Sequence, residues 1–311
     1  MAFTAQDVKK LREMTNVGMM DCKKALQATD GDMDKAVDWL REKGLAKAAK
    51  KAGRIAAEGV ALATVIDGVG VVIEVNSETD FAAKTDAFLD LVKGLAQVVA
   101  KENPADVDAL KACTFPGTNL TVTEIMQEKV MSIGENMQIR RFARFADNTS
   151  VAYVHAGGTH GVLVNLAVEG NADVTEIGKN VAMQIAAMNP KYWDKACVPQ
   201  EDVDHEMAVQ VALMENDPKM ASKPTAVKEK IAAGKLANFY KEDCLLQMDF
   251  VRSDLFTGSV EGYIADAAKK LGAKVKFVDA IHYVKGEGIE KKVDDFAAEV
   301  AAQIANAGAG K

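Results

Sequence analysis

An internal repeat constrains the fold of this 311-residue chain more than any other feature of its sequence. Each copy contains two β-rich runs, a helix, a second helix that ends at a glycine, and a last strand. In chain order these segments are 60–66, 69–75, 88–99, 122–133 and 138–145 in the first copy, and 151–155, 162–168, 177–188, 259–271 and 275–284 in the second. Gly134 and Gly272 then end equivalent helices. The pattern β-β-α-α-β therefore occurs twice, which predicts an α+β fold with a duplicated core.

A long insertion, residues 191–254, interrupts the second copy. Helical segments over Gln200–Glu215 and Thr225–Tyr240 bracket the breaker Asn216-Asp217-Pro218, which predicts an antiparallel helical hairpin. One apolar stripe follows the two helices through Met207, Val211, Met214, Val227 and Ile231. This stripe either seals the two helices together or docks on another chain, and the sequence leaves both interpretations open.

The N-terminal residues 1–55 differ from the rest in charge, with 12 Lys and Arg against 8 Asp and Glu. Three short helices are expected here, the second with Met19, Cys22, Ala25 and Leu26 on one face. A basic stretch follows, and we interpret it as a solvated helical linker. Its basic residues are Lys43, Lys47, Lys50, Lys51 and Arg54.

The last helix is expected over residues 290–304 and contains Phe296. This helix either contacts a partner or packs on the chain's own core. The predicted division of the chain is 1–55, 56–147, 148–190 with 255–286, 191–254, and 287–311.

Composition excludes several classes of protein. The net charge of −7 and the pI near 5.3 argue against a general nucleic-acid binder. No apolar run approaches the ~18 residues of a membrane span, and residues 1–20 have no apolar signal region. The cysteines Cys22, Cys113, Cys197 and Cys244 lie far apart, which is typical of reduced thiols. We therefore expect a cytoplasmic protein that binds neither membrane nor nucleic acid.

Motifs of catalysis are missing from the sequence. It contains no phosphate-binding GxxxxGK[ST] loop, no HExxH and no GxSxG. His155 and His160 lie on a turn between predicted strands, where they would hold a metal only with a third ligand. We expect surface histidines there, and no catalytic residue, metal or cofactor.

The segment Asn76-Ser-Glu-Thr79-Asp80-Phe81-Ala82-Ala-Lys84 connects a buried strand to the helix that contains Phe88. Ser77 and Asp80 have the spacing of a capping box. Phe81 precedes Phe88 by seven residues, and this periodicity favours a place in the core. In the alternative, Thr85 caps the helix and leaves Phe81 exposed on a loop, where an aromatic side chain is a candidate contact for a partner.

Several motifs resemble those of the bacterial elongation factor Ts family. The opening Leu11-Arg-Glu-Met-Thr-Asn-Val-Gly-Met-Met-Asp-Cys-Lys-Lys-Ala-Leu26 resembles its first signature, and Glu74-Val-Asn-Ser-Glu-Thr-Asp-Phe-Ala-Ala-Lys84 resembles its second. Matches continue at Ile133-Gly-Glu-Asn136, Tyr153-Val-His155, Gly161-Val-Leu163 and Gly286-Glu-Gly-Ile-Glu290. The resemblance is collinear from about Thr4 to Ala302.

The resemblance implies a guanine-nucleotide exchange factor for elongation factor Tu, with no catalytic site of its own. It also implies a three-helix ubiquitin-associated-like domain at the N-terminus, two related core subdomains, a hairpin that dimerises in some members, and a C-terminal helical module. The factor would bind the GDP-bound and nucleotide-free partner, disturb its Mg²⁺ site and promote GDP release so that GTP can rebind.

The family's intruding segment matches Thr79, Asp80, Phe81 and Ala82, with Phe81 as an exposed wedge. Ala82 replaces the valine common in relatives. Further partner contacts are implied at Arg12, Met19, Met20, Lys23, His155 and Phe296. After His155, Thr159 and His160 depart from the family pattern, so the resemblance assigns this turn no role.

Two other classes of function remain as alternatives. One is a small-molecule enzyme that uses Glu78, Asp80 and His155. The other is a dimeric scaffold that binds the Tu factor without accelerating GDP release.

Overall fold

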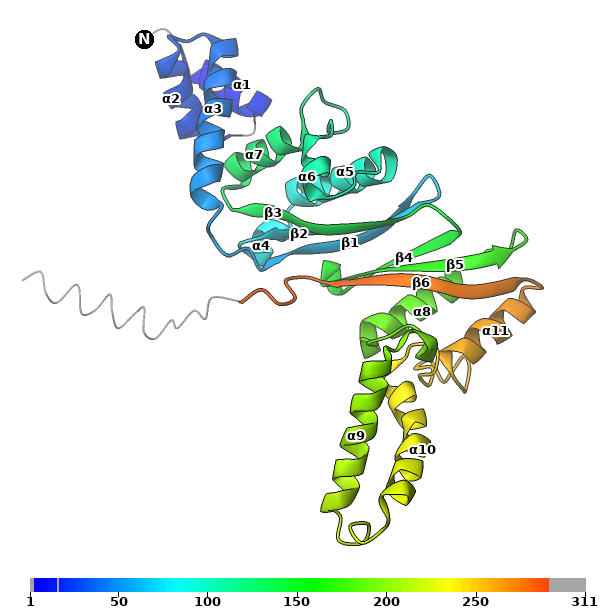
Figure 1. Cartoon of the computed structure of the whole chain (residues 1–311). Coiled ribbons are helices and arrows are strands. Elements are labelled where there is room, and N and C mark those ends of the chain that lie inside the picture. The colour runs from blue at the N-terminus through cyan, green and yellow to red at the C-terminus, as the bar shows by residue number, and fades with distance from the viewer. Residues whose placement is uncertain (1–2, 16, 291–311) are drawn as a thin grey trace, which may run out of the picture.

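The computed structural model describes residues 3–15 and 17–290, and it places two three-stranded antiparallel sheets face to face. The strand orders are β1-β2-β3 and β4-β5-β6, so the second strand is central in both. Helices α5, α6 and α7 cover the outer face of the first sheet, and α8 and α11 cover that of the second (Figure 1). The predicted α+β class is confirmed.

The first sheet begins with a tight hairpin. Asp67 and Gly68 join its first two strands with φ of 52° and 82°, as the short turns of twisted hairpins require. Phe88, Leu91 and Leu95 of α5 pack on Ile73 of the sheet and are almost fully buried. The elements are β1 (Glu58–Ile66), β2 (Val69–Ser77), α4 (Asp80–Ala83), α5 (Asp86–Glu102), α6 (Val107–Ala112), α7 (Val122–Ile133) and β3 (Met137–Phe145).

The second sheet has its own core, in which Val162 and Leu166 of the central strand are buried in one apolar cluster with Ile185 of α8 and Ile264 of α11. The elements are β4 (Thr149–His155), the 3₁₀ turn η1 (Ala156–Gly158), β5 (His160–Glu169), α8 (Thr175–Met188), α11 (Val260–Lys270) and β6 (Lys274–Val284).

Glycines allow the two sheets to approach each other closely. A Cβ atom on Gly161 would lie 2.8 Å from the carbonyl oxygen of Ala61 in the opposite sheet. A small cluster of Ala63, Val72 and Leu163 fills the space between the sheets. Because a larger side chain at Gly161 would push the sheets apart, their spacing depends on the lack of one there.

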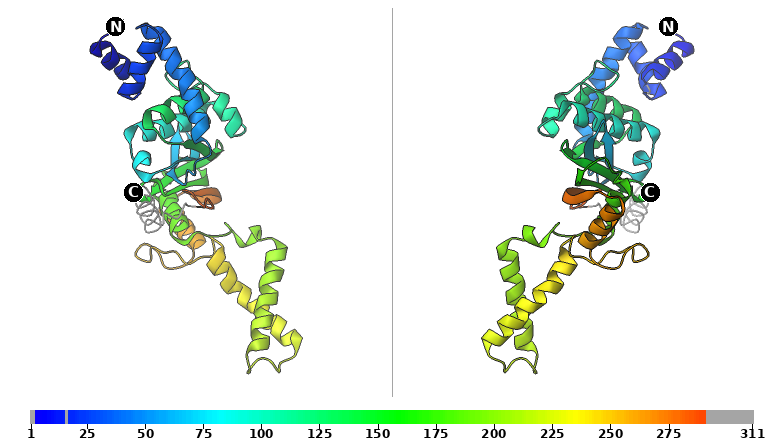
Figure 2. Two further views of the ribbon diagram at one scale, coloured as in Figure 1. Left: turned by 90° about the vertical axis from the view of Figure 1, so that its left-hand side faces the viewer. Right: turned by 90° about the vertical axis from the view of Figure 1, so that its right-hand side faces the viewer.

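The N-terminal helices α1 (Ala5–Thr15), α2 (Met19–Ala28) and α3 (Met33–Lys51) form a bundle at one end of the molecule, and Met131 of α7 packs against it (Figures 1 and 2). Leu11, Cys22 and Leu26 are buried within it. Met19, predicted on the same face of α2 as Cys22 and Leu26, is the first residue of this helix and is 49% exposed. The basic stretch predicted as a helical linker continues α3, which leads into the first sheet.

The hairpin α9 (Gln200–Asn216) and α10 (Thr225–Asp243) projects from the opposite end, after the 3₁₀ turn η2 (Lys195–Cys197) (Figure 2). Met214 is buried between its helices, whereas Val227 of the predicted stripe is 41% exposed. The chain enters and leaves the hairpin side by side. Both Lys191 N and Tyr192 N donate to the carbonyl oxygen of Asp243 at 3.0 Å, and Leu245 N donates to that of Tyr192 at 2.9 Å.

The four cysteines are free thiols, of which Cys22 and Cys244 are buried, Cys113 is half-buried and Cys197 is exposed. Of the helices within the described residues, none has both the length and the apolar character that a membrane crossing requires. Of the helix expected over residues 290–304, residues 291–304, with Phe296, lie outside the part of the chain that the structure describes.

Candidate partner-binding surface

Two threonine residues cap two separate helices in the segment that follows β2. Thr79 caps the single-turn helix α4, where its hydroxyl accepts from Ala82 N at 3.2 Å. Thr85 caps α5 in the same way, with Phe88 N as the donor at 3.3 Å. Because the second cap starts a new helix, α4 and α5 do not share one helical periodicity.

The break between α4 and α5 determines where Phe81 lies. Ala82 and Ala83 face the core, whereas the Phe81 side chain is 80% exposed. The interpretation of Phe81 as a core residue, drawn from its seven-residue spacing to Phe88, is therefore wrong. The capping box expected from Ser77 and Asp80 is wrong as well. Thr79 caps the helix instead, and the Ser77 hydroxyl donates to the carbonyl oxygen of Thr79 at 2.9 Å.

The turn that precedes α4 is tied to a distant segment by two carboxylates. Glu135 accepts from Thr79 N at 2.9 Å and from the Thr79 hydroxyl at 2.6 Å. Glu78 in turn accepts from Asn136 N at 2.6 Å and pairs with the guanidinium of Arg54 at 3.3 Å. Hydrogen bonds from each segment to the other thus connect residues 78–79 and 135–136.

Asp80 already has a partner on its own surface. Its carboxylate pairs with the ammonium of Lys84 at 2.6 Å, and this hydrogen bond lowers the pKa of Asp80. Glu78 is also paired, with Arg54, so both carboxylates that the small-molecule enzyme alternative requires take part in ion pairs within the chain.

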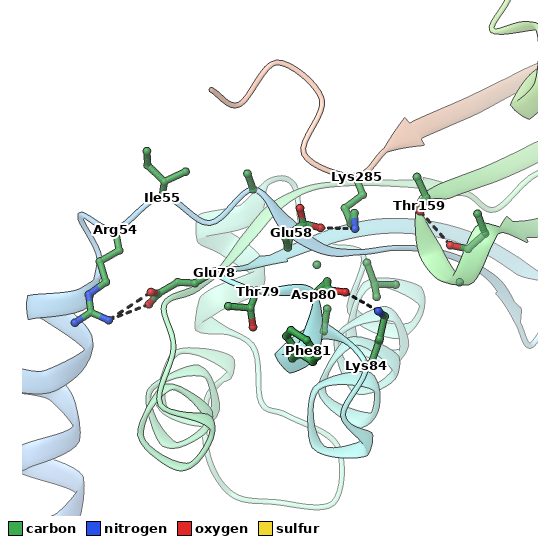
Figure 3. A pocket seen from close by; sticks show the side chains of 16 residues that line it. Arg54, Ile55, Glu58, Glu78, Thr79, Asp80, Phe81, Lys84, Thr159 and Lys285 are labelled. Carbon is green, nitrogen blue, oxygen red and sulfur yellow. Dashed lines mark hydrogen bonds and ion pairs between the residues drawn. The ribbon is translucent and has the colours of Figure 1, made fainter. Parts of the chain in front are cut away.

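Phe81 borders a surface cleft of about 1060 Å³, which Figure 3 shows from close by. One wall comes from β1 and the end of β6, where Lys285 pairs with Glu58 at 2.5 Å. Ala156, Gly157 and Thr159 of the turn between β4 and β5 complete the lining. The cleft therefore combines segments from both sheets with α4 at its edge.

Histidines gather beside this turn. The Tyr153 hydroxyl lies 2.8 Å from His155 Nδ1, and His160 Nδ1 lies 3.0 Å from Nε2 of His282 on β6. Burial and the neighbouring His160 lower the pKa of His282 to about 4. Within residues 3–15 and 17–290, no group of three or more His, Cys, Asp or Glu side chains is arranged to hold a metal ion.

The other predicted contact residues lie elsewhere. Met19 and Met20 of α2 are 49% and 63% exposed, and Arg12 and Lys23 are exposed on the same N-terminal bundle. His155 is exposed at the end of β4, next to the lining of the cleft. The structure thus brings the Phe81 segment and the turn after His155 to one cleft, and it places the N-terminal residues on a second surface.

Glu74 in the centre of the first sheet was not among the predicted site residues. Its fully buried carboxylate accepts from Arg141 Nε at 2.7 Å, from Arg140 at 3.0 Å and from Gly286 N at 2.8 Å. Burial would raise the pKa of Glu74, but these hydrogen bonds outweigh it and lower the pKa. A charged residue inside the apolar run 71–75 is the signal that could have identified it.

Comparisons with known proteins agree with one another. The family model described as "Elongation factor TS" matches residues 78–287. A protein named elongation factor Ts from Clostridioides difficile (strain 630) is 46% identical over 308 residues, which cover 97% of this chain and 99% of that relative. One of the same name from Magnetococcus marinus is 42% identical over 304 residues, with 97% and 98% covered. One from Rhodopseudomonas palustris (strain TIE-1) is 45% identical, with 96% and 97% covered.

Proposed function

The chain belongs to the elongation factor Ts family, and from this premise we propose that it is the guanine-nucleotide exchange factor for elongation factor Tu in protein synthesis. It binds the GDP-bound partner, disturbs the Mg²⁺ site of that partner and promotes the release of GDP, so that GTP can rebind. It acts on a GTPase in the cytoplasm and uses no catalytic residue or cofactor of its own.

The observation that carries this proposal is the exposure of Phe81. A phenyl ring that is 80% exposed on a capped helical turn forgoes ~2 kcal/mol of hydrophobic burial in the free protein. Burial of that ring in a partner recovers this free energy. We propose that Phe81 inserts between helices of the partner's nucleotide domain and moves the groups that hold Mg²⁺.

Thermodynamic linkage converts such a contact into exchange. A contact that is made only when the nucleotide site is empty or distorted lowers the affinity for GDP by the same factor by which GDP weakens the contact. Loss of Mg²⁺ leaves the phosphate charge without its largest counter-charge. Thr79, Asp80 and Ala82 support the wedge: Thr79 and Asp80 through their side chains, and the buried Ala82 through its packing on the core.

Other parts of the chain contribute further contacts in this proposal. The N-terminal bundle, within residues 1–55, contacts the nucleotide domain through Arg12, Met19, Met20 and Lys23. His155, on the second core subdomain (148–190 and 255–286), faces another part of the partner. Self-association through the inserted hairpin remains a prediction, and so does a partner contact at Phe296.

Release of a fluorescent GDP from purified elongation factor Tu tests the proposal. Substoichiometric amounts of this protein should accelerate release, with each molecule acting many times. If the protein binds the Tu factor but leaves the release rate unchanged, the exchange function is refuted and the scaffold alternative replaces it.

A further inference from the structure

Two segments, 78–79 and 135–136, are hydrogen-bonded to each other at the base of α4, and each contributes a carboxylate that accepts from the backbone of the other. Glu78 accepts from the backbone of residue 136, and Glu135 accepts from the backbone of residue 79. Both bonds are charge-assisted and short, at 2.6 and 2.9 Å. Such bonds are about twice as strong as bonds between neutral groups. The reciprocal pair therefore fixes the position of the chain just before Phe81.

Glu135 has a second effect through the Thr79 hydroxyl. The hydroxyl has one proton, and it donates this proton to Glu135 at 2.6 Å. Its lone pairs then point to the other side, where they accept from Ala82 N and start α4. Glu135 thus orients the cap on which the Phe81 turn depends.

Phe81 itself makes few contacts that could fix its direction, because 80% of its side chain is exposed. Its helix has only four residues, and a helix this short does not persist without support from its surroundings. The direction in which the ring points is therefore determined by the base of α4 and not by packing of the ring.

The segment 134–136 also binds the C-terminal end of the N-terminal bundle. Asn136 Nδ2 donates to the carbonyl oxygen of Arg54 at 2.8 Å, and the Lys51 ammonium donates to that of Gly134. The Arg54 guanidinium pairs with Glu78. Three segments that are distant in sequence, 51–54, 78–79 and 134–136, thus meet at one point.

We propose that Glu135 is a positioning residue of the exchange site: it holds Thr79 by both of its donors and so keeps Phe81 in the orientation that reaches the partner. The proposal rests on the exchange function proposed above. It differs from the wedge assignment because Glu135 acts through Thr79 and is not itself required to touch the partner.

The chain offers a matched control. Glu124 accepts from Thr121 N at 2.7 Å and from the Thr121 hydroxyl at 2.9 Å, so the same pair of donors is held at the start of α7. Glu135→Gln and Glu124→Gln each remove one negative charge and weaken one Thr–carboxylate pair. The two variants differ in whether that pair supports Phe81.

The first measurement is the maximal rate of GDP release at saturating protein. Glu135→Gln should lower this rate by roughly tenfold, the effect of losing ~1.4 kcal/mol of transition-state stabilisation, while Glu124→Gln keeps it within about twofold. Binding to the nucleotide-free Tu factor should change far less than the rate. Equal rates for Glu135→Gln and the wild type would overturn the proposal.

A double variant separates positioning from a general loss of structure. In the Phe81→Ala background, Glu135→Gln should slow release no further, because the residue through which it acts has been removed. A further slowing by the same factor as in the wild type would contradict the proposal.

Hydrogen exchange in the free protein completes the test. The Thr79 amide should exchange faster in Glu135→Gln and at an unchanged rate in Glu124→Gln. This result does not depend on the Tu factor. If the wild type fails to accelerate GDP release, the proposed function fails, whereas unchanged exchange at Thr79 refutes the role of Glu135 alone.

Discussion

Phe81 and Phe88 lie seven residues apart on adjoining helices and have opposite environments: the first side chain is 80% exposed and the second is 0% exposed. Lys84 and Thr85 separate the two helices. Because Thr85 caps α5, the side chains of α5 follow a helical periodicity that does not continue that of α4. The same type of side chain therefore serves the surface in one place and the core in the other.

Replacement of these two rings should have opposite effects. Phe81→Ala should change the free energy of unfolding by less than about 0.5 kcal/mol and slow GDP release at least about tenfold. Phe88→Ala should cost about 3–5 kcal/mol of stability, because it opens a cavity in the core of the first sheet. Urea unfolding and nucleotide release measure the two effects. Normal exchange by Phe81→Ala would refute the wedge.

Glu74 should make the fold sensitive to acid. Its pKa in the folded chain is below the ordinary value of 4.5, so its carboxylate contributes stability above that pH and loses it as the pH falls through the lower, folded pKa. Glu74→Gln should remove this dependence. It should also cost about 3 kcal/mol at neutral pH, since Arg140 and Arg141 lose their shared partner. Unfolding curves between pH 3 and pH 7 provide the measurement. An identical acid transition in both proteins would exclude Glu74 as its source.

His282 should titrate far below an ordinary histidine. Burial and His160 lower its pKa from 6.5 to about 4, so its neutral form is the one that the fold stabilises. The stability that it contributes is fully present above pH 6.5 and decreases as the pH falls from 6.5 towards 4. Histidine ring resonances followed by NMR should show this titration, and His160→Asn should shift it upward. A midpoint near 6.5 in the wild type would contradict the buried pair.

Two glycine substitutions should change stability in opposite directions. Gly161→Ala places a methyl group about 2.8 Å from the Ala61 carbonyl oxygen and should cost about 1–3 kcal/mol. Gly234→Ala, in the middle of α10 with nothing within 4 Å of the new atom, should gain about 0.5–1 kcal/mol. Thermal unfolding compares the two. A tolerated alanine at position 161 would mean that the sheets can separate without loss.

Local signals in the sequence were sufficient to predict most of the elements. The helix predicted over 122–133 has those bounds in the structure, because the Thr121–Glu124 capping box starts it and Gly134, with a φ of 89°, ends it. The hairpin helices extend one and three residues beyond their predicted ends. Helix α6 was not predicted, since its six residues are too short a segment to show a helical period.

Features of the site that depend on distant residues could not be predicted. Glu135 holds Thr79 across 56 positions of sequence, and His282 meets His160 across 122. Pairings at that range follow from how the strands are arranged and leave no local pattern. Phe81 shows the complementary failure, since periodicity describes one continuous helix and the two threonine caps divide the segment into two.

The hairpin leaves and rejoins the core at one junction, where Tyr192 is hydrogen-bonded to Asp243 and Trp193 to Leu246. Most of α9 and α10 lies beyond this junction, so the length of these helices does not affect the path of the two sheets. Whole helical turns, each adding about 5.4 Å, could be inserted into or removed from α9 and α10 in step. The length of the α9–α10 hairpin can thus change without changing the distance between the Phe81 turn and the N-terminal bundle.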